Sequence, residues 1–259
     1  SSKLVVNTGG YSTIKLQYNG TSVVDIFSNV SSNIFIGLDS GSVITSGTGN
    51  VALGDNALSA TTIGTSNTAI GYFALDSNVA KQGSTAIGYQ AMMYADNTTT
   101  QGLSYNTAVG YQALVGSPAP SSNTGMYNTV VGHQSMTVNT TGSYNSALGV
   151  NTLINNTIGQ YNVAVGYGAL FTNVAKNASI AIGYEAMRYA DNTTTTGTSG
   201  NIAVGYQALK GSTTASNNTG TNNIALGYQS LYGNTSGYDN VSIGSYAGNA
   251  ITTGSNNSL

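Results

Sequence analysis

Nine residues, NTAIGYFAL at positions 67–75, recur with small changes from residue 33 onward. Clear copies are STAIGYQAM (84–92), NTAVGYQAL (106–114) and NIAVGYQAL (201–209). The spacing between successive central glycines is either 17 or 22, and these glycines are Gly37, Gly54, Gly71, Gly88, Gly110, Gly132, Gly149, Gly166, Gly183, Gly205, Gly227 and Gly244. Spacings of this size are typical of solenoids, in which each repeat forms one coil that stacks on the next.

The coils themselves recur in a longer sequence period. From Gly54 onward the spacings 17, 17, 22, 22 and 17 occur twice in the same order. The repeat region, 33–259, therefore contains two superrepeats, 54–148 and 149–243, with partial coils on either side. Residues 1–32 lie outside the repeats. Their apolar segments KLVV, STIKLQY and SVVDIF predict three strands that form an N-terminal β cap or connector.

Each copy of the motif predicts one short strand. Thr68 and Ile70 alternate with Ala69 and Gly71, and this period of two favours a strand of about five residues. The glycine allows a positive φ at the strand end, and the polar stretch that follows is typical of turns. We expect the strand aliphatic and the Leu or Met of QAL and QAM to fill the interior. The fold class predicted is all-β, a parallel β-solenoid (β-roll) in which the coil lengths are 17 and 22.

Such a coil has a thin core, because its interior offers mostly Ala, Ile and Leu. One coil alone cannot bury enough apolar surface to offset the entropy of ordering its backbone. Stacking of coils supplies part of the missing stability, and lateral association of whole chains supplies more. The sequence therefore predicts a homotrimeric fibre, in which the chain's first partner is itself.

Composition excludes several classes of protein. Charged residues make up only 5% of the chain, and the net charge of −2 gives no basic surface for nucleic acid. The chain contains 18 Tyr and many Val, Ile and Thr, which argues against disorder despite its 34 Gly. No apolar run reaches the roughly 18 residues of a membrane span, so membrane insertion is not expected.

No catalytic constellation is visible in the sequence. There is no cysteine, and the single histidine, His133, stands where other coils have tyrosine. The acidic residues do not follow a calcium-binding pattern. Asp96 and Asp191 are five coils apart, roughly 24 Å at about 4.8 Å per coil, which is too far for a glycosidase pair. We therefore expect no enzyme activity, no metal site and no cofactor.

Two sets of side chains are candidates for binding. One is an aromatic ladder along one edge of the coils, which either packs on itself, the interpretation we favour, or stacks on sugar rings: Tyr72, Tyr89, Tyr111, His133, Tyr167, Tyr184, Tyr206 and Tyr228. The other is a glycan-binding site on the longer coils, with Tyr94 and Asp96 in one superrepeat and Tyr189 and Asp191 in the other. A column of asparagines is expected to form a hydrogen-bonded ladder: Asn67, Asn106, Asn128, Asn145, Asn162, Asn201, Asn223 and Asn240.

The cores NTAIG, STAIG, NVAVG and NIAVG resemble the SVAIG-type repeats in the heads of trimeric autotransporter adhesins, which are left-handed parallel β-rolls. The patterns GYQAL and NAITTGSNN (249–257) resemble shaft repeats of phage tail fibres. These resemblances cover residues 33–259 and imply a structural fibre for cell-surface attachment. The coils here are longer than the usual adhesin repeat, and the printed residues include neither a membrane anchor nor a chaperone segment.

The function expected first is a phage or phage-like tail fibre segment, which implies an extracellular location on a virion. The alternatives are a trimeric adhesin on the bacterial cell surface with glycan binding, and a subunit of a head-to-tail extracellular filament. The filament is considered because GLDSGSVITSGTGN (37–50) and GSYAGNAITTGSNN (244–257) share the same phase of the coil. A cell-surface glycan or protein receptor is an expected partner in either attachment role.

Overall fold

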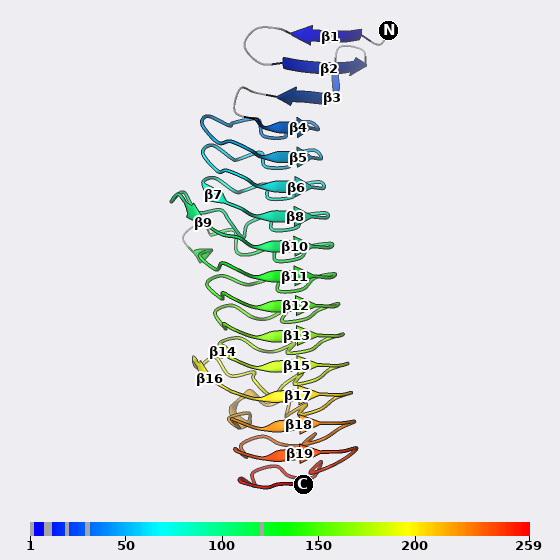
Figure 1. Ribbon diagram of the computed structural model, residues 1–259, viewed down its shortest axis with the longest axis vertical. Helices are drawn as coiled ribbons and strands as arrows, with labels where there is room; N and C mark the ends of the chain where they lie inside the picture. The colour runs from blue at the N-terminus through cyan, green and yellow to red at the C-terminus, as the bar shows by residue number, and fades with distance from the viewer. Residues whose placement is uncertain (1–2, 8–11, 19–20, 29–31, 120–121) are drawn as a thin grey trace. The chain divides into compact units, whose positions relative to one another are not determined.

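The computed structural model describes residues 3–7, 12–18, 21–28, 32–119 and 122–259. The chain divides into two compact units, residues 1–127 and 128–259, each of which is considered separately below. Both units consist of short strands joined by turns, and Figure 1 labels the strands along the chain.

The first unit opens with antiparallel strands and continues with parallel ones. Strand β1 pairs antiparallel with β2, β2 with β3, and β3 with β4. Beyond β4 the pairs β4–β5, β5–β6, β6–β8 and β8–β10 are all parallel. The strands are β1 (Lys3–Asn7), β2 (Ser12–Tyr18), β3 (Thr21–Ser28), β4 (Ile34–Ile36), β5 (Val51–Leu53), β6 (Thr68–Ile70), β7 (Lys81–Gln82), β8 (Thr85–Ile87), β9 (Gly102–Leu103) and β10 (Thr107–Val109).

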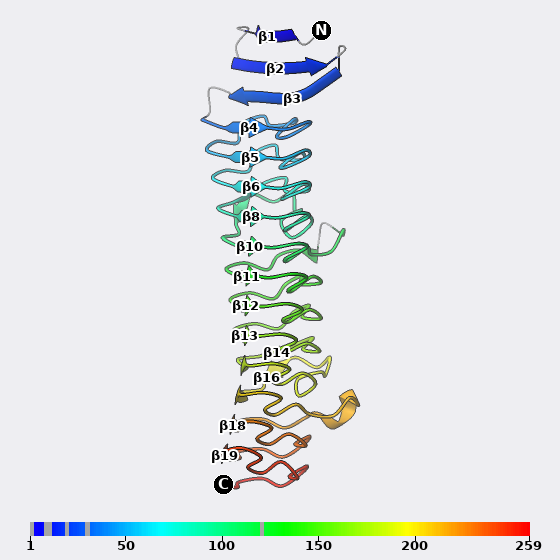
Figure 2. The same ribbon diagram turned by 90° about the vertical axis from the view of Figure 1, so that its right-hand side faces the viewer.

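The second unit is a parallel β-solenoid over its described length. Its main sheet has the order β11-β12-β13-β15-β17-β18-β19. Strands β14 and β16 form a separate parallel pair, and a 3₁₀ turn, η2 (Ala215–Asn217), projects to the side of its coil in Figure 2. The strands are β11 (Thr129–Val131), β12 (Ser146–Leu148), β13 (Val163–Val165), β14 (Lys176–Asn177), β15 (Ile180–Ile182), β16 (Gly197–Thr198), β17 (Ile202–Val204), β18 (Ile224–Leu226) and β19 (Val241–Ile243).

The register of the main strands follows the repeat. Ala69 of β6 lies opposite Ala86 of β8, which is one shorter coil further along the chain. Ala86 in turn lies opposite Ala108 of β10, which is one longer coil further along. Each side pair, β7–β9 and β14–β16, joins a shorter coil to the longer coil that follows it. The insertion that lengthens a coil therefore leaves the main sheet in register and is accommodated at the corner.

The interior is filled differently from our expectation. The central residue of each three-residue strand is buried and is usually alanine, as Ala69, Ala86 and Ala181 show. The Leu or Met of the following turn is also buried, as expected, and supplies the largest core side chain of most coils. The strand aliphatics, however, point outward: Ile70 is half-buried and Ile87 is exposed. The prediction that both aliphatics of a coil are interior was therefore wrong.

The glycine after each strand is required by close backbone approach. Gly71 has a φ of 134°, and a Cβ added there would overlap the carbonyl oxygen of Gly88 in the next coil. The backbone N–H of Gly88 donates to the carbonyl of Ile70 at 2.7 Å. Only a residue without a side chain allows this contact between stacked coils.

A ladder of asparagine side chains runs through each unit. The Nδ2 of Asn162 donates to the Oδ1 of Asn145 at 3.1 Å and to the carbonyl of Lys176 at 2.9 Å. The same Oδ1 accepts the backbone N–H of Asn162 at 3.0 Å. A second buried column, which includes Asn139, Asn156 and Asn173, holds the turn on the far side of the coil. The repeat pattern predicted the first column but not the second.

Candidate functional site

Stacked tyrosines line one edge of the first unit. The rings of Tyr72 and Tyr89 are 5.8 Å apart with planes 16° from parallel, and those of Tyr89 and Tyr111 are 5.0 Å apart at 9°. Each follows the strand-end glycine by one residue, so the register of the strands carries the rings one above the other. All three rings remain exposed at their edges.

The second unit repeats this column with more even spacing. Tyr167, Tyr184, Tyr206 and Tyr228 stack with ring centroids 5.1–5.2 Å apart, and Tyr246 meets Tyr228 edge-on at 66°. His133 stands at the equivalent position of its own coil and is exposed. The rings inside each column turn their faces toward one another. This geometry favours packing of the ladder on itself, because stacking on a sugar requires a free ring face.

A second set of tyrosine pairs was not anticipated from the sequence. Tyr105 and Tyr127 are 5.6 Å apart in the first unit, and Tyr144 and Tyr161 are 5.1 Å apart and nearly parallel in the second. Each has a positive φ and directly precedes an asparagine of the buried ladder. The recurring dipeptide Tyr-Asn was the signal that could have revealed them.

The two aspartates proposed for glycan binding are inside the coils. Asp96 is 2% exposed, and its Oδ1 accepts from the Oγ of Ser104 at 2.7 Å and from the Nδ2 of Asn106 at 3.4 Å. Its Oδ2 accepts from the hydroxyl of Ser84, which stands where the ladder otherwise has asparagine. The carboxylate thus supplies the acceptor that the missing ladder residue would have provided.

Asp191 repeats the arrangement in the second superrepeat. It is also 2% exposed and accepts from Ser179, from Ser199 at 2.7 Å and from Asn201 at 3.4 Å. Burial raises the pKa of both carboxyls above the ordinary aspartate value. The serine and asparagine donors, together with Lys81 near Asp96 and Lys176 near Asp191, oppose that rise in pKa.

The predicted glycan site is therefore not assembled at the surface. Asp96 and Asp191 each accept from one serine of their own coil and one of the preceding coil, and both carboxylates are almost completely shielded from solvent. Tyr94 and Tyr189 are half-buried, and the Oη of Tyr189 accepts from the Nε of Arg188 at 3.0 Å. The prediction of a tyrosine–aspartate pair facing a sugar was wrong for the aspartates: they precede a Thr-rich loop in the sequence, but the chain folds them inward.

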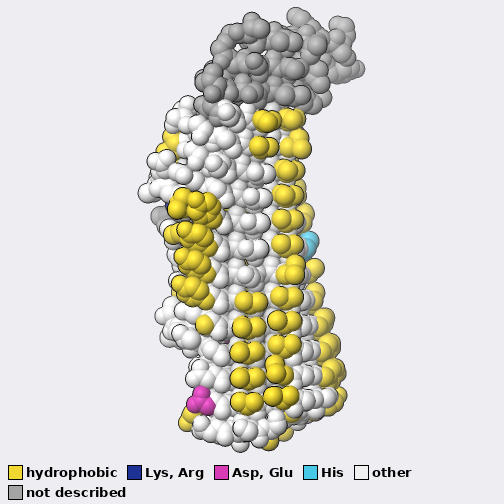
Figure 3. Space-filling model, in the orientation of Figure 1, with side chains coloured by type: hydrophobic (Ala, Val, Ile, Leu, Met, Phe, Trp, Pro, Cys, Tyr) yellow, Lys and Arg dark blue, Asp and Glu magenta, His cyan; other side chains and the backbone are white. Residues whose placement is uncertain are grey.

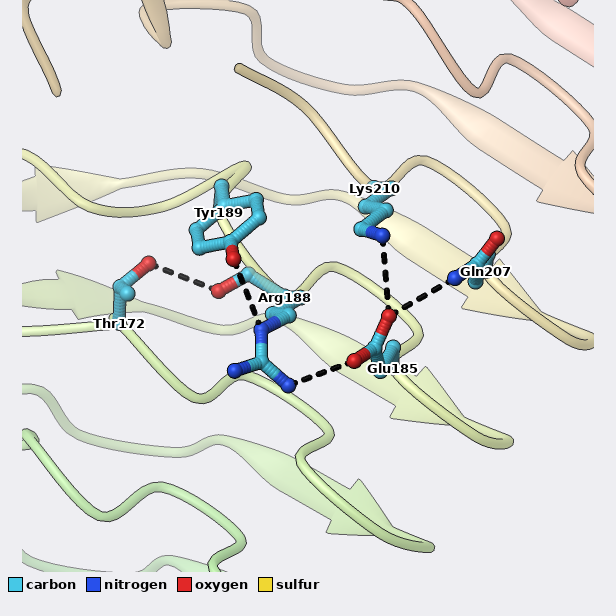
Figure 4. A network of polar contacts seen from close by, with 6 residues as sticks. All are labelled: Thr172, Glu185, Arg188, Tyr189, Gln207 and Lys210. Atoms are coloured by element: carbon cyan, nitrogen blue, oxygen red, sulfur yellow. Dashed lines mark hydrogen bonds and ion pairs between the residues drawn. The ribbon is translucent and has the colours of Figure 1, made fainter. Parts of the chain in front are cut away.

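Charged side chains gather in the second unit around Glu185 (Figure 4). Its Oε1 accepts from the Nη1 of Arg188 at 2.7 Å, and its Oε2 accepts from Lys210 at 3.0 Å and from the Nε2 of Gln207 at 2.8 Å. The guanidinium of Arg188 lies 4.4 Å from the ring centre of Phe171. Partial burial alone would raise the pKa of Glu185, but the hydrogen bonds from Lys210 and Gln207 and both cations lower it.

The first superrepeat has neutral residues at these positions. Gln90 replaces Glu185, Met93 replaces Arg188 and Val115 replaces Lys210. Gln112 donates to Gln90 at 2.8 Å, so an amide ladder takes the place of the charged cluster. The same coil is thus built with or without the ions, so the cluster is not a requirement of the fold.

One hollow of about 280 Å³ lies between the corner loops of the second unit. It is lined by Asn192, Thr193, Thr194, Thr195, Ala215, Ser216 and Thr219. None of these lining residues is aromatic or charged, so the hollow lacks the groups that hold sugars or ions most firmly.

No group of histidine and acidic residues among the described residues could hold a metal ion. No helix in that part of the chain is long and apolar enough to cross a membrane. Comparison with family models, curated proteins and solved structures found no match to this chain.

Proposed function

We propose that this protein is a structural fibre segment, a stalk that holds an attachment structure away from its base. The observation that carries the proposal is that polar side chains form hydrogen bonds between neighbouring coils. Asn145 and Asn162 donate to and accept from neighbouring coils, and the carboxylate of Asp191 accepts from the hydroxyl of Ser179 in the preceding coil. The functional groups that a binding protein presents to a ligand are committed here to joining one coil to the next.

The stalk is proposed to be a homotrimer on the outside of a phage or phage-like particle. The trimer is supported by the small interior of each coil, whose core residues are mostly alanine with one Leu or Met. The tail-fibre assignment is supported by the resemblance of GYQAL and NAITTGSNN to shaft repeats. A bacterial surface adhesin and a head-to-tail filament remain the competing proposals.

Sedimentation equilibrium of the purified protein tests the trimer. The expected mass is three times the 26.3 kDa of one chain, independent of concentration over the usual working range. A folded monomer would refute the trimer, and a mass that grows with concentration would favour the filament.

Two further measurements separate stalk from adhesin and filament. On a glycan array the stalk should give no saturable binding, whereas an adhesin should. Electron microscopy should show short particles of uniform length, and long fibres would instead support head-to-tail assembly.

A further inference from the structure

One face of the second unit is apolar over five consecutive strands. The first residue of each strand points outward, and these residues are Val163, Ile180, Ile202, Ile224 and Val241. The third residue also points outward, and these are Val165, Ile182, Val204, Leu226 and Ile243. Figure 3 shows the two resulting columns side by side. We call the ten residues the aliphatic face.

The aliphatic face is open to solvent in the single chain. Ile182 is 38% exposed and Ile243 is 61% exposed. The tyrosine column begins two residues beyond the second aliphatic column, as in Ile182 and Tyr184, and widens the same surface. No charged residue occupies the three columns on these strands.

This surface is as large as the apolar patches that mark interaction sites on monomers. Five strands at about 4.8 Å and four residues at about 3.3 Å give a projected area of roughly 300 Å². The outward Leu148 of the preceding strand, 52% exposed, extends it along the sheet. The largest apolar patch of a typical soluble monomer covers about 300–600 Å² and is often functional. The aliphatic face can therefore form the core of an interface that buries about 800 Å² per partner.

The periodicity of the face indicates its partner. Matching rows of aliphatic residues recur at the spacing of paired strands, so a complementary surface needs the same axial repeat. A second copy of this chain has that repeat, and it brings no charge that would be buried unpaired. The first unit is less suited to such an apolar contact, because the corresponding first column there consists of Thr68, Thr85 and Thr107.

We propose that the aliphatic face is the lateral contact between copies of the chain, turned toward the shared axis of the fibre. This inference rests on the proposed trimer and adds the surface that forms it. The interface would be apolar along the strands, with the tyrosine column at its margin.

The test compares matched charge pairs. Ile182 and Val204 lie opposite each other on β15 and β17, so in I182K/V204E the new charges pair within one chain and face solvent in a monomer. Between copies they would be buried. The control is T194K/S216E, which introduces the same charges at exposed corner positions of the same unit. The mass of I182K/V204E should fall threefold with its circular dichroism unchanged, and the mass of the control should not change.

Each result of this experiment supports or refutes the proposed interface. If I182K/V204E keeps the wild-type mass, the aliphatic face is not the interface, although the trimer stands. If the wild-type chain is a monomer, both proposals fail. If I182K/V204E does not fold, labelling decides: the chain has no cysteine, so the thiol of I182C can be compared with that of S216C. Slow maleimide labelling of I182C alone supports the interface, and equal rates refute it.

Discussion

Single polar residues hold the coils together, and the buried aspartates show how specific their placement is. Where Ser84 and Ser179 interrupt the asparagine ladder, Asp96 and Asp191 replace the lost acceptor. The substitution is possible because the longer coil brings a side chain from further along the chain back into the ladder. Sequence reasoning could not foresee this fold-back, since an aspartate beside a Thr-rich loop is ordinarily exposed.

The buried aspartates predict an unusual pH dependence. Burial raises the pKa of both carboxyls in the folded chain above the 3.8 of an ordinary aspartate. The folded state therefore binds these protons more tightly than the unfolded state does. The stabilisation that this tighter proton binding gives the folded state is fully present below pH 3.8. It is lost as the pH rises through the pKa that the carboxyls have in the folded chain.

Urea unfolding at a series of pH values measures the effect. The D96N/D191N variant should lose this fall in the free energy of unfolding, because a neutral amide occupies the same space at every pH. The exposed Asp239 provides the control D239N, which should keep the wild-type profile. A D96N/D191N profile that falls as steeply as that of the wild type would contradict the prediction.

At the scale of strands and turns, the sequence predicted where each strand lies but not which side faces inward. The motif Thr-Ala-Ile has apolar residues on both faces, so alternation alone could not orient it. Packing decides, because the central strand residue and the turn that follows it face the interior, where Ala69 and Ala74 are fully buried. The interior therefore selects the small residue and leaves Ile70 outside, against our expectation.

The strand-end glycine sets the contact between stacked coils, which predicts a sharp difference between two glycine substitutions in the first unit. In G71A the new Cβ would overlap the backbone of Gly88, and the residue would keep a strained φ of 134°. We expect a loss of at least about 3 kcal/mol of stability. In G102A the nearest atom is the Nζ of Lys81 at 3.4 Å, and the change should be within about 0.5 kcal/mol. Thermal and urea unfolding measure both, and similar losses would show that the close approach is not the constraint.

At the scale of the whole chain, the repeat arithmetic was the most informative part of the sequence. The two glycine spacings predicted the strand partners, as Ala164 opposite Ala181 and Ala181 opposite Ala203 show. The repeat spacing could not reveal how chains associate, because aliphatic side chains that point outward and those that point inward recur along the sequence at the same interval. Only the burial of each side chain distinguishes them.

The modular register predicts that a whole coil can be removed. Deleting 145–161 joins Tyr144 to Asn162 and removes one complete shorter coil, so β11 can pair with β13 in the original phase. We expect the circular dichroism of the native fold and a modest fall in the urea midpoint. Deleting 145–160 instead leaves one extra residue, Tyr161, directly before the ladder residue Asn162, where β13 must slip or bulge to pair with β11, so the urea midpoint should fall much further. Equal outcomes for the two deletions would contradict a fixed register.

The constant separation of paired strands along the sequence also affects how the protein folds. Within each unit a parallel strand finds its partner one coil away along the chain, however many coils precede it. Relative contact order therefore falls as such a chain lengthens, although parallel sheets ordinarily fold slowly because their partners are remote. A nascent chain can add each coil to the previous one as it leaves the ribosome. A gene extended by one more coil would then encode a longer protein whose added strand finds its partner no more slowly than the others do.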